Sequence, residues 1–250
     1  MKIIKTANYE EMGLEAAKII IEKVRSNPGT VLGLATGSTP RGVYKYMVDD
    51  HQQKATNYEE VRTVNLDEYV GLPETDENSY HFFMKQHLFN HLNIPKNQTF
   101  LPSGVAENLD VECKRYEKLI KNLGGVDLQI LGIGRNGHIG FNEPGTSFKS
   151  RTQIVDLAES TRMANARFFT SYEDVPTKAI TVGISTILDS KEILLLASGS
   201  SKAEAIKKLL EDEANEQFPA SALKHHDQVT IIADEEALQL VEKERLSYDR

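Results

Sequence analysis

The stretch that decides the fold is Thr30-Val-Leu-Gly-Leu-Ala35, which runs directly into Thr36-Gly-Ser-Thr-Pro40. Its first half carries no charge and has the length of a buried strand. The glycine and hydroxyl residues behind it mark a turn, and Pro40 suits the first position of a helix. A strand that passes through a tight turn into a helix begins a βαβ unit, the repeating element of a parallel sheet.

The same order recurs along the chain. Asn8 and Glu11 indicate a capping box for a first helix, which ends at Asn27-Pro28-Gly29. Further apolar runs of strand length are Val61–Leu66, Val126–Ile133, Ala179–Ile184, Glu192–Ala197 and Val229–Ala233. These runs are apolar on both faces, as expected where helices cover both sides of a sheet. The predicted fold class is therefore α/β: a three-layer αβα sandwich around a mostly parallel, modified Rossmann-like sheet.

The chain is predicted to form a single domain over residues 1–250, because α/β folds of this length commonly do. No internal repeat, low-complexity tract or interdomain linker divides it. The segment from about 152 to 176 is longer and more polar than a simple connection between elements. We expect this segment to form a lid.

The overall charge excludes some classes of partner. A net charge of −8 and an isoelectric point near 5.5 argue against nucleic acid and against an anionic membrane surface. No apolar run has the length of a membrane span, and the first residues lack the apolar region of a signal peptide. Cys113 is the only cysteine, so neither a disulfide nor a thiolate metal site is available. We expect a cytoplasmic protein in which an anionic ligand needs a local pocket of donors.

Two turns that follow strands have the composition of a phosphate site. In the first, Thr36, Gly37, Ser38 and Thr39 precede a helix, and their backbone N–H groups could hold a phosphate. The second, Ser198-Gly-Ser-Ser-Lys202, also opens a helix and adds a positive charge. Taken alone, a simple N-cap and a solvated lysine explain these turns equally well.

Two other turns carry groups that transfer protons. Asp67 and Glu68 come directly after a strand, and Asp67 is the better candidate for a base because Glu68 is expected to point to solvent. In the loop from Leu131 to Gly145, several glycines surround His138, whose imidazole Glu143 could orient. The loop contains a G-x-G-x-x-G pattern, but no helix signal follows it, so we interpret the match to a dinucleotide fingerprint as accidental.

The four turns are stronger evidence for a site when they are considered together. Ligands of open parallel sheets bind outside the carboxyl ends of the strands, where all four turns are expected to lie. The joint interpretation is an active site for a phosphorylated small molecule. No metal is predicted, because His87 and His91 have helical i,i+4 spacing but no evident third ligand.

Three stretches then resemble the signatures of glucosamine-6-phosphate deaminases: Leu34–Pro40, Asn65–Leu72 and Gly134–Pro144. The resemblance runs nearly end to end. The related 6-phosphogluconolactonases typically continue the histidine loop with small residues and Leu-Phe-Pro, whereas this chain reads Gly140-Phe-Asn-Glu-Pro144. The resemblance implies an aldose–ketose isomerisation coupled to deamination in amino-sugar catabolism. Glucosamine 6-phosphate and water give fructose 6-phosphate and ammonium, without a metal or redox cofactor.

The resemblance also implies a role for individual residues. Asp67 matches the base that moves a proton between C2 and C1, and His138 matches the group that opens the sugar ring, supported by Glu143. The positions that match phosphate and substrate contacts are Ser38, Thr39, Lys202 and a lid arginine, Arg167.

At two places the sequence departs from the family pattern, and each departure predicts a difference in behaviour. Many members have aspartate where this chain has Asn136. An asparagine orients the imidazole but cannot stabilise imidazolium by charge. The pKa of the group that opens the sugar ring should therefore differ. Allosterically activated members carry two basic residues where this chain has Gln153 and Val155. We therefore expect an enzyme that N-acetylglucosamine 6-phosphate does not activate.

Two alternatives remain open. A 6-phosphogluconolactonase would use the same phosphate pocket and histidine for ester hydrolysis. A non-catalytic sugar-phosphate sensor would bind the ligand without releasing ammonia, and would not need both Asp67 and His138. The sequence does not decide between a monomer and a homo-oligomer.

Overall fold

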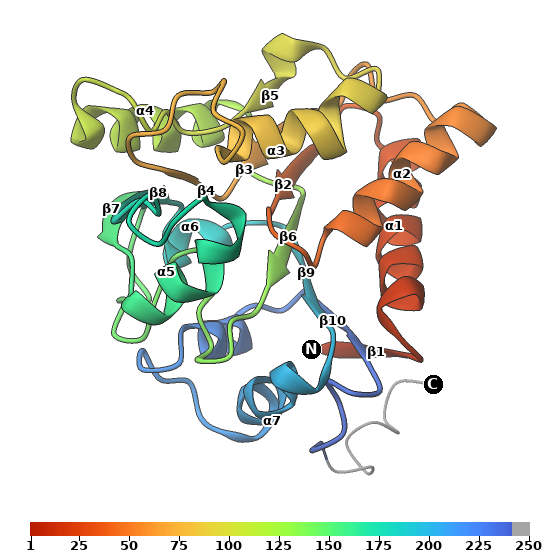
Figure 1. Ribbon diagram of the computed structural model, residues 1–250. Helices are drawn as coiled ribbons and strands as arrows, with labels where there is room; N and C mark the ends of the chain where they lie inside the picture. The colour runs from red at the N-terminus through yellow and green to blue at the C-terminus, as the bar shows by residue number, and fades with distance from the viewer. Residues whose placement is uncertain (242–250) are drawn as a thin grey trace.

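A seven-stranded parallel sheet forms the centre of the protein (Figure 1). The computed structural model describes residues 1–241, except the side chain of residue 164. The strand order of the sheet is β1-β10-β9-β6-β2-β3-β5, and every neighbouring pair is parallel. The strands are β1 (Lys2–Thr6), β2 (Val31–Leu34), β3 (Arg62–Asn65), β5 (Thr99–Phe100), β6 (Leu128–Gly132), β9 (Glu192–Ala197) and β10 (Val229–Asp234). The predicted mostly parallel sheet is confirmed.

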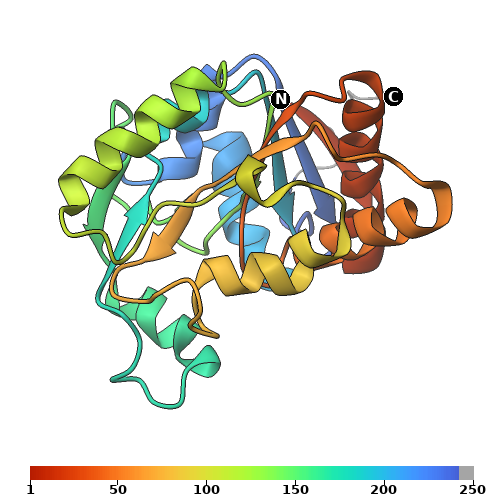
Figure 2. The same cartoon turned by 90° about the horizontal axis from the view of Figure 1, so that it is seen from above.

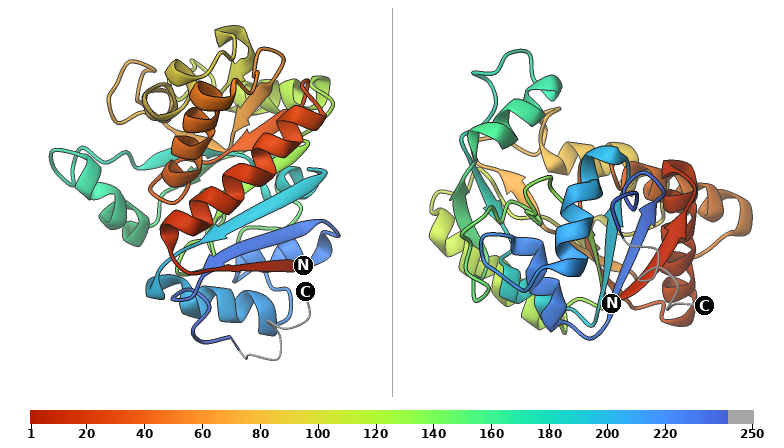
Figure 3. Two further views of the ribbon diagram at one scale, coloured as in Figure 1. Left: turned by 90° about the vertical axis from the view of Figure 1, so that its right-hand side faces the viewer. Right: turned by 90° about the horizontal axis from the view of Figure 1, so that it is seen from below.

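Helices cover both faces of this sheet, which confirms the predicted three layers (Figures 1 and 3). One face holds α1 (Tyr9–Ser26), α2 (Arg41–Lys54) and α3 (Tyr80–His87); the other holds α4 (Leu109–Asn122), α6 (Ile184–Leu188) and α7 (Ala203–Glu211). Successive residues of β9 alternate between the two cores, with Leu194 and Leu196 toward α1 and Ile193 and Leu195 toward α7. A strand buried on both sides needs the uninterrupted apolar sequence seen here.

The predicted first helix has the predicted cap. The Asn8 side chain accepts a hydrogen bond from the Glu11 N–H at 3.0 Å, while the Glu11 carboxylate accepts from the Ala7 N–H at 2.6 Å. The reciprocal bond thus reaches one residue further back than in the usual capping box. Five short 3₁₀ segments complete the described elements: η1 (Phe89–His91), η2 (Lys96–Gln98), η3 (Ala166–Phe168), η4 (Ser200–Lys202) and η5 (Pro219–His225).

A second, antiparallel sheet of three strands corrects one expectation. It consists of β4 (Asp67–Tyr69), β8 (Lys178–Thr181) and β7 (Gln153–Asp156), in the order β4-β8-β7. The predicted strand Ala179–Ile184 belongs to this small sheet rather than to the parallel one, and Ile184 already begins α6. The chain leaves the main sheet after β3, passes Leu66 and immediately pairs Asp67 with Thr181. Asp67 therefore lies at the junction of the two sheets.

The segment predicted as a lid projects from the body (Figures 2 and 3). Its helix α5 (Glu159–Asn165) continues into η3, and the Leu157 N–H donates to the Thr177 carbonyl oxygen at 2.8 Å where the two arms meet the body. The first part of the predicted lid, Gln153–Asp156, is instead strand β7, because it pairs with β8. No helix within residues 1–241 is long and apolar enough to cross a membrane.

Candidate active site

The four turns singled out in the sequence follow four strands that are neighbours in the sheet. These strands are β9, β6, β2 and β3, consecutive in the strand order and parallel to one another. Their carboxyl ends lie at one edge of the sheet, the edge at which open α/β sheets bind ligands. The sequence-based expectation of a shared edge is confirmed for these loops.

The loop after β2 is held in place by the first helix. The Tyr9 hydroxyl donates to the Ser38 carbonyl oxygen and accepts from the Gly42 N–H, both at 2.8 Å. Gly37 has φ +91°, a conformation that side chains disfavour. A cavity of about 640 Å³ joins this loop to the loop after β9; its lining residues include Tyr9, Ser38, Thr39, Arg41 and Ser198. Neither Tyr9 nor Arg41 was predicted from the sequence.

Lys202 lies in a loop that is held in place by hydrogen bonds to a buried carboxylate. Asp234, at the end of β10, accepts from the Ser198 hydroxyl and from the Gly199 N–H, the latter at 3.0 Å. The Lys202 ammonium donates to the Ile133 carbonyl oxygen at 2.7 Å, which brings it to the glycine-rich loop. Burial lowers the pKa of Lys202, and the nearby charge of Arg135 lowers it further. The charges of Lys202 and Arg135 thus act on each other at the glycine-rich loop.

Asp67 is a buried carboxylate with 6% exposure. Among residues 1–241 no side chain or backbone N–H donates a hydrogen bond to it. Burial and the neighbouring charge of Glu68 raise its pKa to about 8. A carboxylate of this kind is a stronger base than an exposed one, as proton abstraction from carbon requires.

Glu68 does not point to solvent, so that expectation was wrong. It is fully buried, and its carboxylate accepts from the backbone N–H groups of Tyr80 and His81, each at 3.0 Å. His81 Nδ1 lies 2.9 Å from the same carboxylate. Glu68 therefore satisfies the otherwise unpaired N–H groups at the start of α3. Its side chain leaves β4 on the opposite face from that of Asp67, as alternate strand residues do.

Asn136, His138 and Glu143 form a connected relay. The Asn136 amide donates to Glu143 Oε2 at 2.6 Å, and its oxygen lies 2.7 Å from His138 Nδ1. Because a carboxylate only accepts, the amide nitrogen must face Glu143 and the amide oxygen must face the imidazole. His138 consequently carries its proton on Nδ1, and Nε2 keeps a free lone pair. The structure brings these predicted residues together.

Two glycines allow the relay loop to pack closely. A Cβ atom on Gly134 would lie 2.3 Å from the His138 ring, so the imidazole rests directly on the backbone. Gly140 has φ +57°, and a Cβ there would lie 3.5 Å from Asp67 Oδ2. The relay loop and the candidate base therefore approach each other at Gly140. The Phe141 N–H donates to the Thr181 hydroxyl at 3.1 Å, which anchors this loop to the strand that pairs with Asp67.

Glu143 is ionised in this setting. Burial alone raises its pKa, but the histidine and the hydroxyl and amide donors outweigh burial and hold the pKa at about 2. One of these donors was not foreseen: the Thr161 hydroxyl of α5 donates to Glu143 Oε1 at 2.6 Å. A lone threonine in a polar segment gives no sequence signal for this contact.

Arg167 is not brought to the other site residues. Its guanidinium stacks on the ring of Phe168 at 4.7 Å and makes no hydrogen bond or ion pair with another residue that the structure describes. The side chain is exposed on the projecting segment. A role for Arg167 at the site therefore requires movement of this segment.

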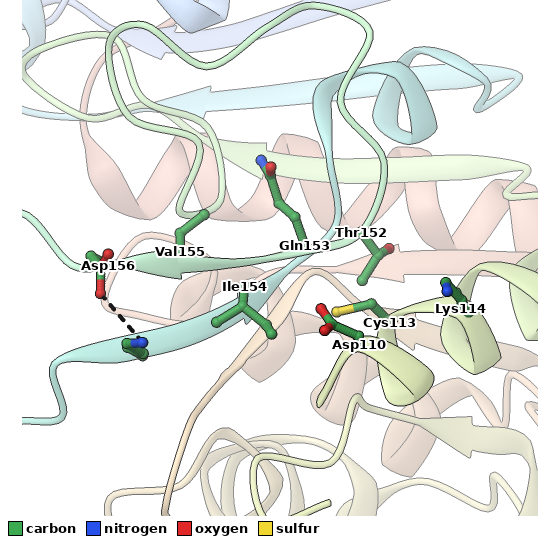
Figure 4. Close-up of a pocket in the computed structure, with 9 residues that line it drawn as sticks. Asp110, Cys113, Lys114, Thr152, Gln153, Ile154, Val155 and Asp156 are labelled. Carbon is green, nitrogen blue, oxygen red and sulfur yellow. Dashed lines mark ion pairs between the residues drawn. The ribbon is translucent and has the colours of Figure 1, made fainter. Parts of the chain in front are cut away.

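Gln153 and Val155 line a separate open groove of about 580 Å³ between β7 and α4 (Figure 4). Both side chains point to one side of β7 and Ile154 points to the other. Lys178, also in this groove, pairs with Asp156 at 3.9 Å. At these two positions the groove thus presents an amide and an apolar side chain.

Comparison with known proteins assigns the family. The family of glucosamine-6-phosphate isomerases and 6-phosphogluconolactonases matches residues 5–232. The chain belongs to this family. A curated family member from Geobacillus sp. (strain WCH70), glucosamine-6-phosphate deaminase, is 58% identical over 245 residues, which are 98% of each chain.

Solved structures of a deaminase and of a 6-phosphogluconolactonase were compared with this chain. A monomeric glucosamine-6-phosphate deaminase is 54% identical and superposes with a TM-score of 0.95, over 96% of this chain and 100% of that one. A 6-phosphogluconolactonase from Trypanosoma cruzi shares the fold, with a TM-score of 0.78 and 21% identity over 96% of each chain. The predicted resemblance to glucosamine-6-phosphate deaminases is confirmed.

Proposed function

We propose that this protein converts glucosamine 6-phosphate and water to fructose 6-phosphate and ammonium. The observation that carries the proposal is the approach, at Gly140, of an unpaired buried carboxylate to the loop that carries an imidazole whose proton is fixed on Nδ1. One group suits proton transfer at carbon and the other suits proton transfer at oxygen. High identity to deaminases along the whole chain supports the same conclusion.

The loops after β2 and β9 would hold the phosphate. The backbone and side chains of Thr36, Gly37, Ser38 and Thr39 supply neutral donors, and Lys202 supplies charge. These donors compensate locally for a net charge of −8, which repels an anionic substrate at long range. Arg167 would add a second charged contact when the projecting segment closes over the sugar.

His138 would open the sugar ring. With Nδ1 protonated and bonded to Asn136, Nε2 is free to take the proton of the C1 hydroxyl and return it to the ring oxygen. Glu143, held ionised, compensates for the positive charge that the imidazole gains during this transfer. Asn136 transmits orientation but no charge, so more of the electrostatic support falls to Glu143.

Asp67 would then carry one proton between adjacent carbons. It removes the C2 proton from the open-chain form, which gives an enolamine, and returns the proton to C1, which gives a ketimine. Water hydrolyses the ketimine to fructose 6-phosphate and ammonium. The substrate amine, when protonated, lies beside the carboxylate and favours its ionised form. No step in this sequence calls for a metal or a redox cofactor.

An assay with two substrates tests this proposal. We expect ammonium and fructose 6-phosphate from glucosamine 6-phosphate, and no accelerated hydrolysis of 6-phosphogluconolactone. Lactone hydrolysis without ammonium release would contradict the proposal and favour the lactonase branch. Saturable binding of glucosamine 6-phosphate without any product would favour a sensor.

We further propose a single domain over residues 1–250, of which the last nine lie outside the described residues, with the projecting segment as its lid. A cytoplasmic location is proposed because Cys113 is a free, buried thiol, and burial raises its pKa to about 11. The uncharged side chains of Gln153 and Val155 support an enzyme without activation by N-acetylglucosamine 6-phosphate.

A further inference from the structure

The projecting segment has one polar connection to the body of the protein. Among the residues that the structure describes, the bond from Thr161 Oγ1 to Glu143 Oε1 is the only hydrogen bond or ion pair that joins residues 158–176 to the rest of the chain. Thr161 is 7% exposed, whereas Met163 and Phe168 on the same segment are 61% and 51% exposed. A buried hydroxyl on a helix whose neighbouring residues are exposed or half-buried indicates a specific partner.

The partner is the carboxylate that supports the relay. Glu143 Oε2 accepts from Asn136, and Oε1 accepts from Thr161, so each oxygen has its own short hydrogen bond of 2.6 Å. The Glu143 backbone is fixed separately, because its carbonyl oxygen accepts from the Thr146 hydroxyl at 2.7 Å. The two hydrogen-bond donors therefore determine only the side-chain torsions of Glu143. Without Thr161, Oε1 has no donor among residues 1–241 and the carboxylate can turn.

The helix that carries Thr161 is also held to the second arm of the segment. Its neighbour Arg162 donates to the Val175 carbonyl oxygen at 3.0 Å and to the Tyr172 hydroxyl at 3.2 Å. The guanidinium also lies over the Tyr172 ring at 4.4 Å. Movement of the segment therefore moves α5 as a unit and carries the Thr161 hydroxyl with it.

We propose that Thr161 is a positioning residue that couples the lid to the relay: its hydroxyl fixes the Glu143 carboxylate, which fixes Asn136 and thereby the Nδ1–H tautomer of His138. The ring-opening base is correctly oriented only while α5 is seated on Glu143. This inference rests on the proposed function of the relay, but its structural part concerns the imidazole alone.

Kinetics with matched variants test the coupling. Thr161→Val removes the hydroxyl without changing the shape of the side chain, and we expect kcat for glucosamine 6-phosphate to fall about tenfold, the effect of losing one bond to a charged group. Thr161→Ser should restore the rate, and Ser160→Ala, which alters an exposed hydroxyl on the same helix, should leave it unchanged. In a Glu143→Ala background, which has no acceptor for the hydroxyl, Thr161→Val should cost nothing further, because both changes act through one carboxylate. A full additional loss in that background would overturn the proposal.

Nitrogen NMR of the histidine side chains provides a readout that does not depend on turnover. With the His138 signals assigned through His138→Gln, wild type should show the neutral ring protonated on Nδ1, and Thr161→Val should shift part of the population to Nε2. An unchanged tautomer in Thr161→Val overturns the inference. If wild type makes no ammonium, the proposed function fails, and the NMR comparison still decides whether Thr161 orients the relay.

Discussion

At the scale of single residues, the neighbours Asp67 and Glu68 show how one strand gives two carboxylates different tasks. Glu68 is surrounded by donors and stabilises the start of α3, whereas Asp67 is buried without a donor among the described residues. An ionised carboxylate without donors opposes folding, since burial favours its neutral form. The candidate base is therefore a local cost in stability, as functional groups often are.

This cost predicts a pH-dependent effect of Asp67→Asn on stability. The pKa of Asp67 is raised to about 8, from about 3.8, so the folded state binds more protons than the unfolded state between these values. The contribution of Asp67 to stability therefore falls as pH rises from about 4 to 8. The neutral asparagine escapes this loss. Thermal melts should therefore show Tm of the variant gaining on wild type by roughly 10 °C between pH 5 and pH 8.5, at about 1.4 kcal/mol per pH unit and about 2–4 °C per kcal/mol. An equal Tm difference at both pH values would contradict the raised pKa.

Some of the site residues could be predicted from the sequence and others could not. Asp67, His138 and Glu143 stand directly behind strands or among glycines, so their position along the chain is informative. Glu68 was misread because its donors lie on α3, which begins at Tyr80, and local sequence does not show where that helix returns. Thr161 could not be identified, because its contact with Glu143 depends on how the projecting segment folds back.

At the scale of elements, the link between α1 and the phosphate loop leads to a prediction. Tyr9, in the first turn of α1, bridges the Ser38 carbonyl oxygen and the Gly42 N–H. Tyr9→Phe should loosen this loop and raise KM for glucosamine 6-phosphate several-fold, up to about tenfold, with little change in kcat. Tyr46→Phe removes a hydroxyl that makes no hydrogen bond within residues 1–241 and serves as the control. Equal effects of the two variants on KM would refute the assigned role of Tyr9.

The elements themselves were predictable where burial was complete. β2, β6, β9 and β10 are nearly continuous apolar runs, and each coincides with a predicted strand. β1 was missed because it lies at the edge of the sheet and has only two apolar residues, Ile3 and Ile4, between two lysines. The strand at Ala179 was found but assigned to the wrong sheet, since periodicity does not distinguish parallel from antiparallel partners.

At the scale of the whole molecule, the groove at Gln153 and Val155 predicts simple kinetics. An anionic activator would find neither cation there, and Lys178 is already paired with Asp156. Rate curves for glucosamine 6-phosphate should be hyperbolic and should not change with N-acetylglucosamine 6-phosphate. Sigmoidal curves that the activator straightens would refute this prediction.

The parallel sheet brings four separate stretches of sequence to one edge, and the small antiparallel sheet places the base beside the loop that carries the relay. The most direct test of this arrangement is the release of ammonium and fructose 6-phosphate from glucosamine 6-phosphate by wild type and by Asp67→Asn. We predict product from wild type and a rate at least about 100-fold lower from a folded Asp67→Asn variant. No product from folded wild type, or a wild-type rate from Asp67→Asn, would contradict the account.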